Sequence, residues 1–127
     1  MDKPLIFQER ILVVDDDKNI TDMLVSILEQ EGIVDYASNG EEALNILDED
    51  YCAAIITDVD MPVMNGIEFF NRAVQMYPNI GERFLFLVEE SELNKYLPFF
   101  RKNNLKYHIK TPQMSMVREA VINILNR

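Results

Sequence analysis

Charged residues come directly after three short apolar runs of this chain, and their types suit phosphoryl and metal chemistry. These residues are Asp15, Asp16, Asp58 and Lys110. A single Asp at the end of a strand can simply cap the helix that follows. Several carboxylates at one sheet edge repel one another unless a cation lies among them, and Mg²⁺ prefers such oxygen ligands. A nearby Lys suits a phosphoryl oxygen, and an Asp can act as the nucleophile. The residue types therefore predict phosphoryl transfer to Asp beside Mg²⁺.

Five short apolar runs alternate with segments of helical period, and they must position these side chains. The predicted strands are Ile11–Val14, Ile33–Ala37, Tyr51–Thr57, Phe84–Val88 and Leu105–Ile109. Continuous apolar runs are typical of strands buried on both faces. Five strand–helix units predict an α/β domain with an open, doubly wound parallel sheet, since a closed barrel needs eight. Ligands of such sheets bind at the carboxyl ends of the strands.

Helix-period stripes follow the strands. In the first stripe, Ile20 to Leu28 carry apolar residues at helical spacing, and Gly32 is placed to end that helix. Leu93, Leu97 and Phe100 mark a helix face before the fifth strand, where Pro98 can introduce a kink.

Composition excludes several function classes. The 127 residues include 22 acidic and 12 basic side chains, for a net charge of −10, which argues against direct binding to nucleic acid or to anionic membranes. The lone Cys52 excludes an internal disulfide and a multi-Cys zinc site. Residues 1–4 do not begin a secretory signal, and the longest apolar run, residues 51–56, is too short to span a membrane. We therefore expect a soluble, cytoplasmic protein. From Asn94 onward the charge reverses, with seven basic residues and one acidic residue.

Three strings, in this order and at these separations, resemble the receiver domain of two-component response regulators. They are ILVVDDD (residues 11–17), IITDVDMPVMNG (residues 55–66) and YHIK (residues 107–110). The resemblance covers essentially the whole chain. It implies one receiver domain over residues 1–127, with a flavodoxin-like five-stranded parallel sheet in the order 2-1-3-4-5 and five helices.

The resemblance also implies a role for each matching residue. Asp58 matches the phosphoacceptor, which takes a phosphoryl group from a histidine kinase with Mg²⁺. Asp15 and Asp16 match the acidic pair that holds Mg²⁺, Asp16 directly and Asp15 largely through water. Asp58 and the backbone carbonyl of Asp60 complete the metal ligands, and Lys110 matches the residue that contacts the phosphoryl group.

Partners follow from the same resemblance. They are a histidine kinase or phosphotransfer protein and a downstream output domain or protein. The output partner is expected on the face made by the fourth helix, fifth strand and fifth helix, where the basic residues after Asn94 lie; a homodimer is also open. The chain is expected to be a phosphoacceptor and not an enzyme, with at most slow self-dephosphorylation.

The end of the fourth strand departs from the family pattern. Receivers usually carry Thr or Ser there, followed by a small residue; this chain has Val88 and Glu89. Val88 cannot donate a hydrogen bond, and Glu89 adds a negative charge where a phosphoryl group arrives. At about 4 Å that repulsion is ~1 kcal/mol or more. We therefore expect an atypical switch.

Three other positions complete the comparison. Thr111 stands where the family usually has Pro, and a cis Lys110–Thr111 bond is not expected because it costs about 2.5–4 kcal/mol. Tyr107 matches the aromatic switch residue and could equally fill the sheet edge. Asp17 has no match in the family and is expected to be solvated or to cap a helix.

Two other functions fit parts of the sequence. A pseudo-receiver would keep the fold as a protein-docking module, with weak or no phosphorylation because of Val88 and Glu89. A haloacid-dehalogenase-like phosphatase would use Asp58-Val59-Asp60 as its DxD motif. That class needs a longer chain, and the Asp15–Asp16 pair fits it poorly.

Overall fold

The computed structural model describes residues 8–112 and 114–126. Its strands are β1 (Arg10–Val14), β2 (Ile33–Ala37), β3 (Cys52–Asp58), β4 (Phe84–Val88) and β5 (Lys106–Ile109). Its α-helices are α1 (Lys18–Leu28), α2 (Gly40–Glu49), α3 (Gly66–Met76), α4 (Leu93–Lys102) and α5 (Ser115–Leu125). Short 3₁₀ turns, η2 (Ile80–Arg83) and η3 (Glu90–Glu92), flank β4. The expectation for residues 1–4 lies outside the described residues.

The five strands form one parallel sheet in the order β2-β1-β3-β4-β5. This confirms the predicted flavodoxin-like fold and its strand order. The predicted strand bounds differ from the observed ones by at most one residue, at β1, β3 and β5. No helix of the described part is both long and apolar enough to cross a bilayer.

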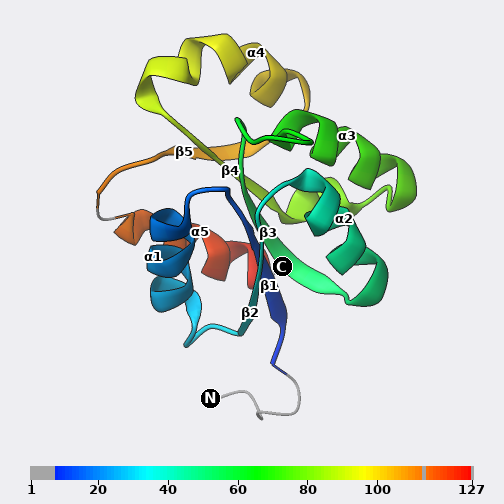
Figure 1. Cartoon of the computed structure of the whole chain (residues 1–127), viewed down its shortest axis with the longest axis vertical. Coiled ribbons are helices and arrows are strands. Elements are labelled where there is room, and N and C mark those ends of the chain that lie inside the picture. Colours follow the sequence, from blue (N-terminus) through cyan, green and yellow to red (C-terminus); the bar gives the residue numbers. More distant parts are fainter. Residues whose placement is uncertain (1–7, 113, 127) are drawn as a thin grey trace.

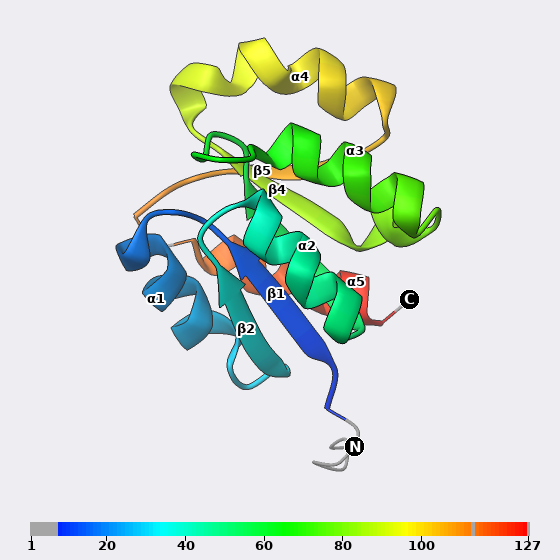
Figure 2. The ribbon, with the colours of Figure 1, turned by 45° about the vertical axis from the view of Figure 1, so that its right-hand side comes forward.

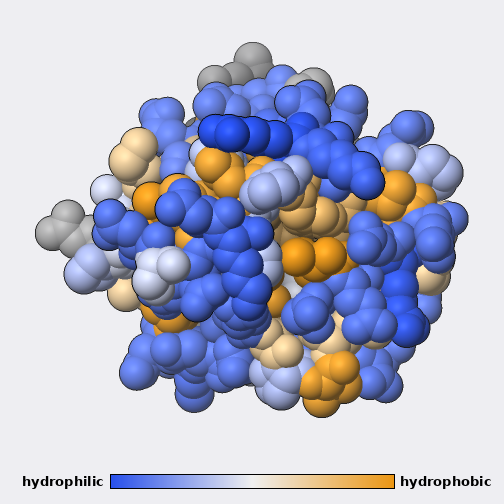
Figure 3. All heavy atoms as spheres, turned by 90° about the horizontal axis from the view of Figure 1, so that it is seen from above, coloured by the Kyte–Doolittle hydropathy of each residue, from blue (hydrophilic) through white to orange (hydrophobic). Residues whose placement is uncertain are grey.

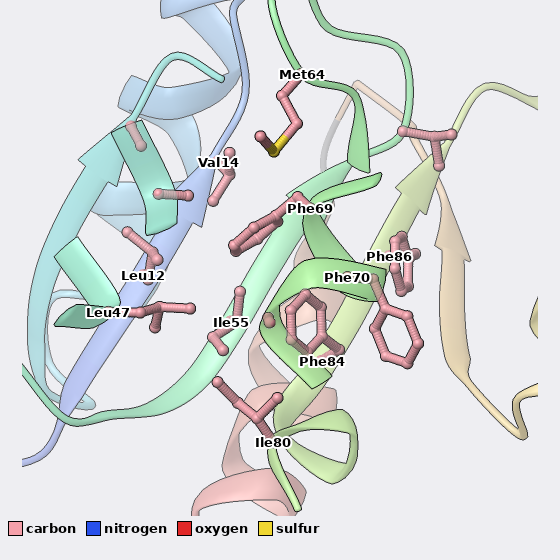
Figure 4. Packing of buried hydrophobic residues seen from close by; sticks show 14 of the residues in the cluster. Leu12, Val14, Leu47, Ile55, Met64, Phe69, Phe70, Ile80, Phe84 and Phe86 are labelled. Carbon is pink, nitrogen blue, oxygen red and sulfur yellow. The ribbon is translucent and has the colours of Figure 1, made fainter. Parts of the chain in front are cut away.

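Helices cover both faces of the sheet (Figures 1 and 2). One face packs on α2, α3 and α4 through a cluster that includes Leu12, Ile55 and Phe69. Figure 4 shows this cluster at close range. The other face packs on α1 and α5, and there the strands contribute alternate residues such as Ile11 and Ile56. Because neighbouring residues of a strand point to opposite faces, these central strands are apolar throughout, as predicted.

Aromatic rings dominate the core beneath α3 and α4. Phe70 of α3 lies edge-on to Phe84 of β4, with ring centroids 5.1 Å apart. Phe86 of β4 in turn packs against Phe100 of α4 at 5.3 Å. Such pairs add about 0.5–1.5 kcal/mol each beyond the area they bury. They fix α3 and α4 against the face of the sheet that these helices cover.

Gly32 has a different role from the one predicted. Helix α1 ends at Leu28 and is capped by Glu29, three residues before Gly32. A Cβ at Gly32 would lie 2.3 Å from the carbonyl oxygen of Glu9. Glycine is needed here because two chain segments meet at the start of β1 and β2, where the Ile33 amide donates to that same carbonyl over 2.9 Å.

Helix α4 continues through Pro98, which lies inside it. Its buried face is formed by Tyr96 and Phe100, whereas Leu93 and Leu97 are half-buried at its margin. The predicted stripe therefore omitted Tyr96. Tyr96 was not counted as apolar because of its hydroxyl, although its ring packs in the core.

The loop between β3 and α3 is held by close backbone contacts. The Gly66 amide donates to Val59 O over 2.8 Å, and the Gly40 amide donates to Met64 O over 3.0 Å. Val63, at the tip of the loop, has a φ of 68° and is 74% exposed. A β-branched residue in this left-handed region is strained, so the surrounding contacts must maintain the conformation.

Candidate functional site

The register of β1 and β3 brings two acidic residues together. Val14 pairs with Thr57 at the carboxyl ends of these neighbouring strands. The next residues, Asp15 and Asp58, therefore lie side by side, and both are buried, with 3% and 7% of their surface exposed. Strand β2 lies on one side of β1 and strand β3 on the other, so the strand order reverses at β1. In sheets of this topology, ligands bind at the carboxyl ends of the strands next to that reversal, which here is the position of Asp15 and Asp58.

Lys110 reaches the same place from β5. Its amide donates to Val88 O over 2.9 Å, which extends the pairing of β4 and β5 by one residue. Its Nζ lies 3.1 Å from Asp15 Oδ2 and 3.1 Å from Asp58 Oδ1. The ammonium thus lies between the two buried carboxylates. The Asp58 Oδ1 atom also accepts a 2.8 Å hydrogen bond from the Val59 amide.

Burial and mutual repulsion shift the pKa values of this cluster. Burial, followed by the charge of Asp15, raises the pKa of Asp58 to about 6, even though Lys110 lowers it. Burial also raises the pKa of Asp15. For Lys110, burial lowers the pKa, but the charges of Asp58 and Asp15 outweigh that effect and the net shift is upward. One ammonium does not fully compensate two buried carboxylates.

The carboxylates of this cluster fit a divalent cation. One oxygen each from Asp15, Asp16 and Asp58 lies within 4.8 Å of the other two. Asp15 Oδ1 accepts a hydrogen bond from the Asp17 amide over 2.9 Å. Asp15 Oδ2 is buried and, despite its proximity to Lys110 Nζ, has no hydrogen bond of acceptable geometry in the described structure. Its closest charged partner is therefore the Lys110 ammonium, and one ammonium leaves net negative charge that a bound cation would offset. Asp16 is exposed, so the cluster opens to solvent.

The rim of the pocket carries further acidic groups. The residues that line it are Asp15, Asp16, Asp17, Asp58, Val59, Asp60, Val88, Glu89 and Lys110. Val88 is buried and belongs to the aromatic core on the α3–α4 face, whereas Glu89 is exposed. The end of β4 thus contributes no hydroxyl and one more carboxylate to the pocket. Figure 3 views this end of the molecule from above and shows a largely hydrophilic surface interrupted by separate hydrophobic patches.

Three other positions singled out in the sequence lie around this centre. Asp17 is the N-cap of α1, where its side chain accepts from the Asn19 amide over 2.9 Å. Tyr107 is 36% exposed and stacks on Phe100 with centroids 5.0 Å apart, so its ring covers the edge of the sheet. The described residues contain no cis peptide bond, as expected for Lys110–Thr111. The Thr111 hydroxyl instead accepts from the Met114 amide over 3.0 Å before α5.

Tyr96 lies outside the pocket lining but contacts the Asp60 side chain, and the sequence analysis missed this contact. Its hydroxyl donates a short hydrogen bond to Asp60 Oδ1, and the two residues are 36 positions apart in the chain. Burial, with the hydrogen bond to Asp60, raises the pKa of Tyr96 to about 12, so the hydroxyl stays protonated and donates at neutral pH. A buried Tyr needs such a partner. The signal available in the sequence was the spacing of Tyr96 and Phe100, four residues apart on one helix face.

The chain matches a known protein family over most of its length. Residues 11–111 match the family model described as "Response regulator receiver domain". The response regulator receiver protein CpdR of Brucella abortus is 36% identical over 78 residues, which are 61% of this chain and 65% of that protein. Sporulation initiation phosphotransferase F of Bacillus subtilis is 28% identical over 117 residues, which are 91% of this chain and 93% of that protein.

A solved structure of a response regulator also resembles this chain over most of its length. The response regulator protein TrrA from Thermotoga maritima, in complex with Mg²⁺ and BeF, superposes with a TM-score of 0.77 at 29% identity, covering 92% of this chain and 99% of that one. This chain aligns with only part of other curated relatives: over 70 residues with a 14.6 kDa protein of Leptolyngbya boryana, which are 53% of that protein, and over 60 residues with a CpxR homolog of Haemophilus influenzae, which are 26% of that protein. Residues 11–111, which match the family model, contain all four clustered side chains described above. The chain therefore belongs to the family of response regulator receiver domains of two-component systems.

Proposed function

We propose that this chain acts as one receiver domain that accepts a phosphoryl group on Asp58 from a phosphohistidine of a histidine kinase or phosphotransfer protein. The observation that carries the proposal is the buried pair Asp15 and Asp58, which share Lys110 at 3.1 Å from each. In the transfer, a bond forms between a carboxylate oxygen of Asp58 and phosphorus while the bond from phosphorus to the donor imidazole nitrogen breaks. The imidazole leaves with that electron pair.

The residues around Asp58 would have separate roles in this transfer. Lys110 would neutralise charge on the incoming phosphoryl oxygens, since its ammonium already lies beside Asp58. Asp15, Asp16 and Asp58, with the backbone carbonyl of Asp60, would hold Mg²⁺. When bound, that ion supplies charge neutralisation for the phosphoryl group. The carboxylate oxygens of Asp15, Asp16 and Asp58, which lie within 4.8 Å of one another, support this assignment. The result is a phosphoacceptor with at most slow self-dephosphorylation.

The partner surfaces follow from the same fold. Receiver domains of this family interact with histidine kinases and with output domains. We place the output contact on α4, β5 and α5, which carry five of the twelve basic residues of this acidic chain. Charge of opposite sign on a partner would speed its association with this face.

Acetyl phosphate with Mg²⁺ tests phosphorylation directly. We expect intact-mass spectrometry to show an 80 Da adduct (the mass of PO₃H, about one phosphoryl group) on the natural chain and none on Asp58→Asn. Glu89→Ala should acquire the adduct faster, because it removes a charge from the pocket rim. A standard receiver treated in parallel checks the reagent. If that receiver is modified and this chain is not, the phosphoacceptor assignment is wrong.

The same pocket raises the alternative of a docking module. Val88 and Glu89 remove the usual hydroxyl and add a carboxylate, which favours weak phosphorylation. If the chain is a pseudo-receiver, Asp58→Asn should bind the partner as tightly as the natural chain does, both with and without a phosphate donor. For a phosphoacceptor, binding should differ between the unmodified and the phosphorylated chain.

A further inference from the structure

The hydrogen bond between Tyr96 and Asp60 joins two parts of the molecule with different roles. Asp60 lies in the loop two residues after Asp58, and Tyr96 lies in the first half of α4. The Tyr96 side chain is 8% exposed and packs in the aromatic core. A hydroxyl donating to a carboxylate from a partly buried position makes a stronger hydrogen bond than one between neutral groups. The bond therefore constrains the loop and the helix to move together.

Helix α4 is otherwise weakly secured at its beginning. Its N-cap, Glu92, makes no side-chain capping hydrogen bond. Pro98 lacks the amide that would continue the helical ladder to the preceding turn. In Figures 1 and 2, α4 lies at the margin of the molecule, beyond α3. The hydrogen bond from the Tyr96 hydroxyl to Asp60 thus holds the first half of α4, where few other polar contacts do so.

The contact continues through the helix to β5. Tyr96 and Phe100 lie four residues apart and so share one face of α4. Phe100 stacks on Tyr107 with an interplanar angle of 15° and a centroid distance of 5.0 Å. A contiguous path therefore runs from the loop through Tyr96 and Phe100 to the exposed edge of Tyr107. Val88, the last residue of β4, is aliphatic and so provides no hydroxyl for another route.

We propose that the Tyr96–Asp60 hydrogen bond is the connection by which the phosphoacceptor loop sets the position of α4. A shift of the loop on binding at the acidic pocket then reaches Phe100 and Tyr107 through α4 rather than through a hydroxyl on β4. The part that concerns ligand binding rests on the proposed function. The connection itself is a property of the unliganded chain, and it can be tested separately.

The first test is a double-mutant cycle on amide hydrogen exchange without ligand. Tyr96→Phe removes the hydroxyl and keeps the ring, and Asp60→Ala removes the acceptor. Each is expected to speed exchange of the Leu97 and Phe100 amides about tenfold, from the strength of a charge-assisted hydrogen bond. The double variant should exchange no faster than either single variant, because both lose the same bond.

Tyr77→Phe is the matched control, since the Tyr77 hydroxyl donates to Asp48 Oδ1 over 2.8 Å far from the pocket. It should leave α4 exchange within about twofold, as expected for a site with no shared partners. The proposal is overturned if the effects of Tyr96→Phe and Asp60→Ala multiply in the double variant, or if Tyr77→Phe accelerates α4 exchange equally.

The second test adds Mg²⁺ and beryllofluoride and follows backbone amide chemical shifts by NMR. In the natural chain and in Tyr77→Phe, shifts are expected both at the pocket amides and along α4. In Tyr96→Phe the pocket amides should still shift, with Mg²⁺ affinity within about threefold of the natural chain, while the α4 shifts fall by more than half. Full α4 shifts in Tyr96→Phe would refute the connection. An absence of pocket shifts in the natural chain would instead refute the proposed function, and the exchange cycle would still decide the connection.

Discussion

At the scale of single residues, desolvation controls the chemistry of the pocket. Asp58 is 7% exposed, and burial is the largest cause of its raised pKa. The charge of Asp15 adds to this effect, and Lys110 opposes it. A carboxylate in this condition binds a proton readily, and it binds a cation for the same reason. Protons and Mg²⁺ therefore compete for one site.

The affinity for Mg²⁺ should consequently depend on pH. Because the folded pKa of Asp58 is about 6, its carboxylate is ionised above that pH and protonated below it. We expect the dissociation constant for Mg²⁺ to be nearly constant from pH 7 to 8 and to rise about tenfold by pH 5. Isothermal titration calorimetry at several pH values measures this. In Asp58→Asn the dependence around pH 6 should flatten, and equal affinities of the natural chain at pH 5 and 8 would contradict the prediction.

At the scale of elements, the site depends on how closely the start of α3 approaches the end of β3. A Cβ at Gly66 would lie 2.2 Å from the carbonyl oxygen of Asp58. Asn65 caps the helix at the same place, since its side chain accepts from the Glu68 amide over 2.9 Å. Together these contacts hold the loop that contains Asp60 and the strained Val63.

Gly66→Ala should disturb both folding and binding. Its methyl group cannot fit without moving the backbone of Asp58, so we expect a loss of about 1–3 kcal/mol in the free energy of unfolding. Mg²⁺ binding should also weaken, because the Asp60 carbonyl moves with the loop. Gly81→Ala is the control, because a Cβ there meets the Phe70 ring at an ordinary 3.5 Å. Urea denaturation should place that variant within about 0.5 kcal/mol of the natural chain, and an equal loss in both variants would contradict this explanation.

At the scale of the whole molecule, the pocket is a place where stability is reduced for function. Two buried carboxylates share one ammonium in an already acidic chain with a net charge of −10. A raised carboxyl pKa means that the folded state binds a proton more tightly than the unfolded state. The contribution of Asp58 to stability is therefore lost as pH rises from about 4 to about 6.

Neutralising Asp58 should stabilise the fold without Mg²⁺. At pH 7.5 we expect Asp58→Asn to raise the free energy of unfolding by on the order of 1–2 kcal/mol, because relief from desolvation outweighs the loss of one Lys110 contact. Urea denaturation measures the change. Added Mg²⁺ should stabilise the natural chain and have little effect on the variant. Asp22→Asn, an exposed position paired with Lys18, should change stability by less than about 0.5 kcal/mol. A destabilised Asp58→Asn would show that the Lys110 pair dominates instead.

Local patterns were sufficient to predict an open parallel sheet with charged residues at the carboxyl ends of its strands, whereas the strand order was predicted from the resemblance to receiver domains. The apolar runs of β1, β3 and β4 are typical of strands buried on both faces, and the carboxyl ends of parallel strands meet at one edge. Asp15, Asp58 and Lys110 were therefore predictable as neighbours. Gly32 was misjudged because helix termination and close backbone approach both select glycine, and sequence spacing does not distinguish them.

The sequence by itself determined the fold and the acidic pocket, because periodicity and strand ends are local signals. Only the tertiary structure decided which oxygen of Asp15 lacks a hydrogen bond, how far burial raises the pKa of Asp58, and where Tyr96 donates. The physical reason is that these properties depend on distances between residues far apart in the chain. Tyr96 and Asp60 are separated by 36 positions, and only the packing of α4 over the loop brings their side chains into contact.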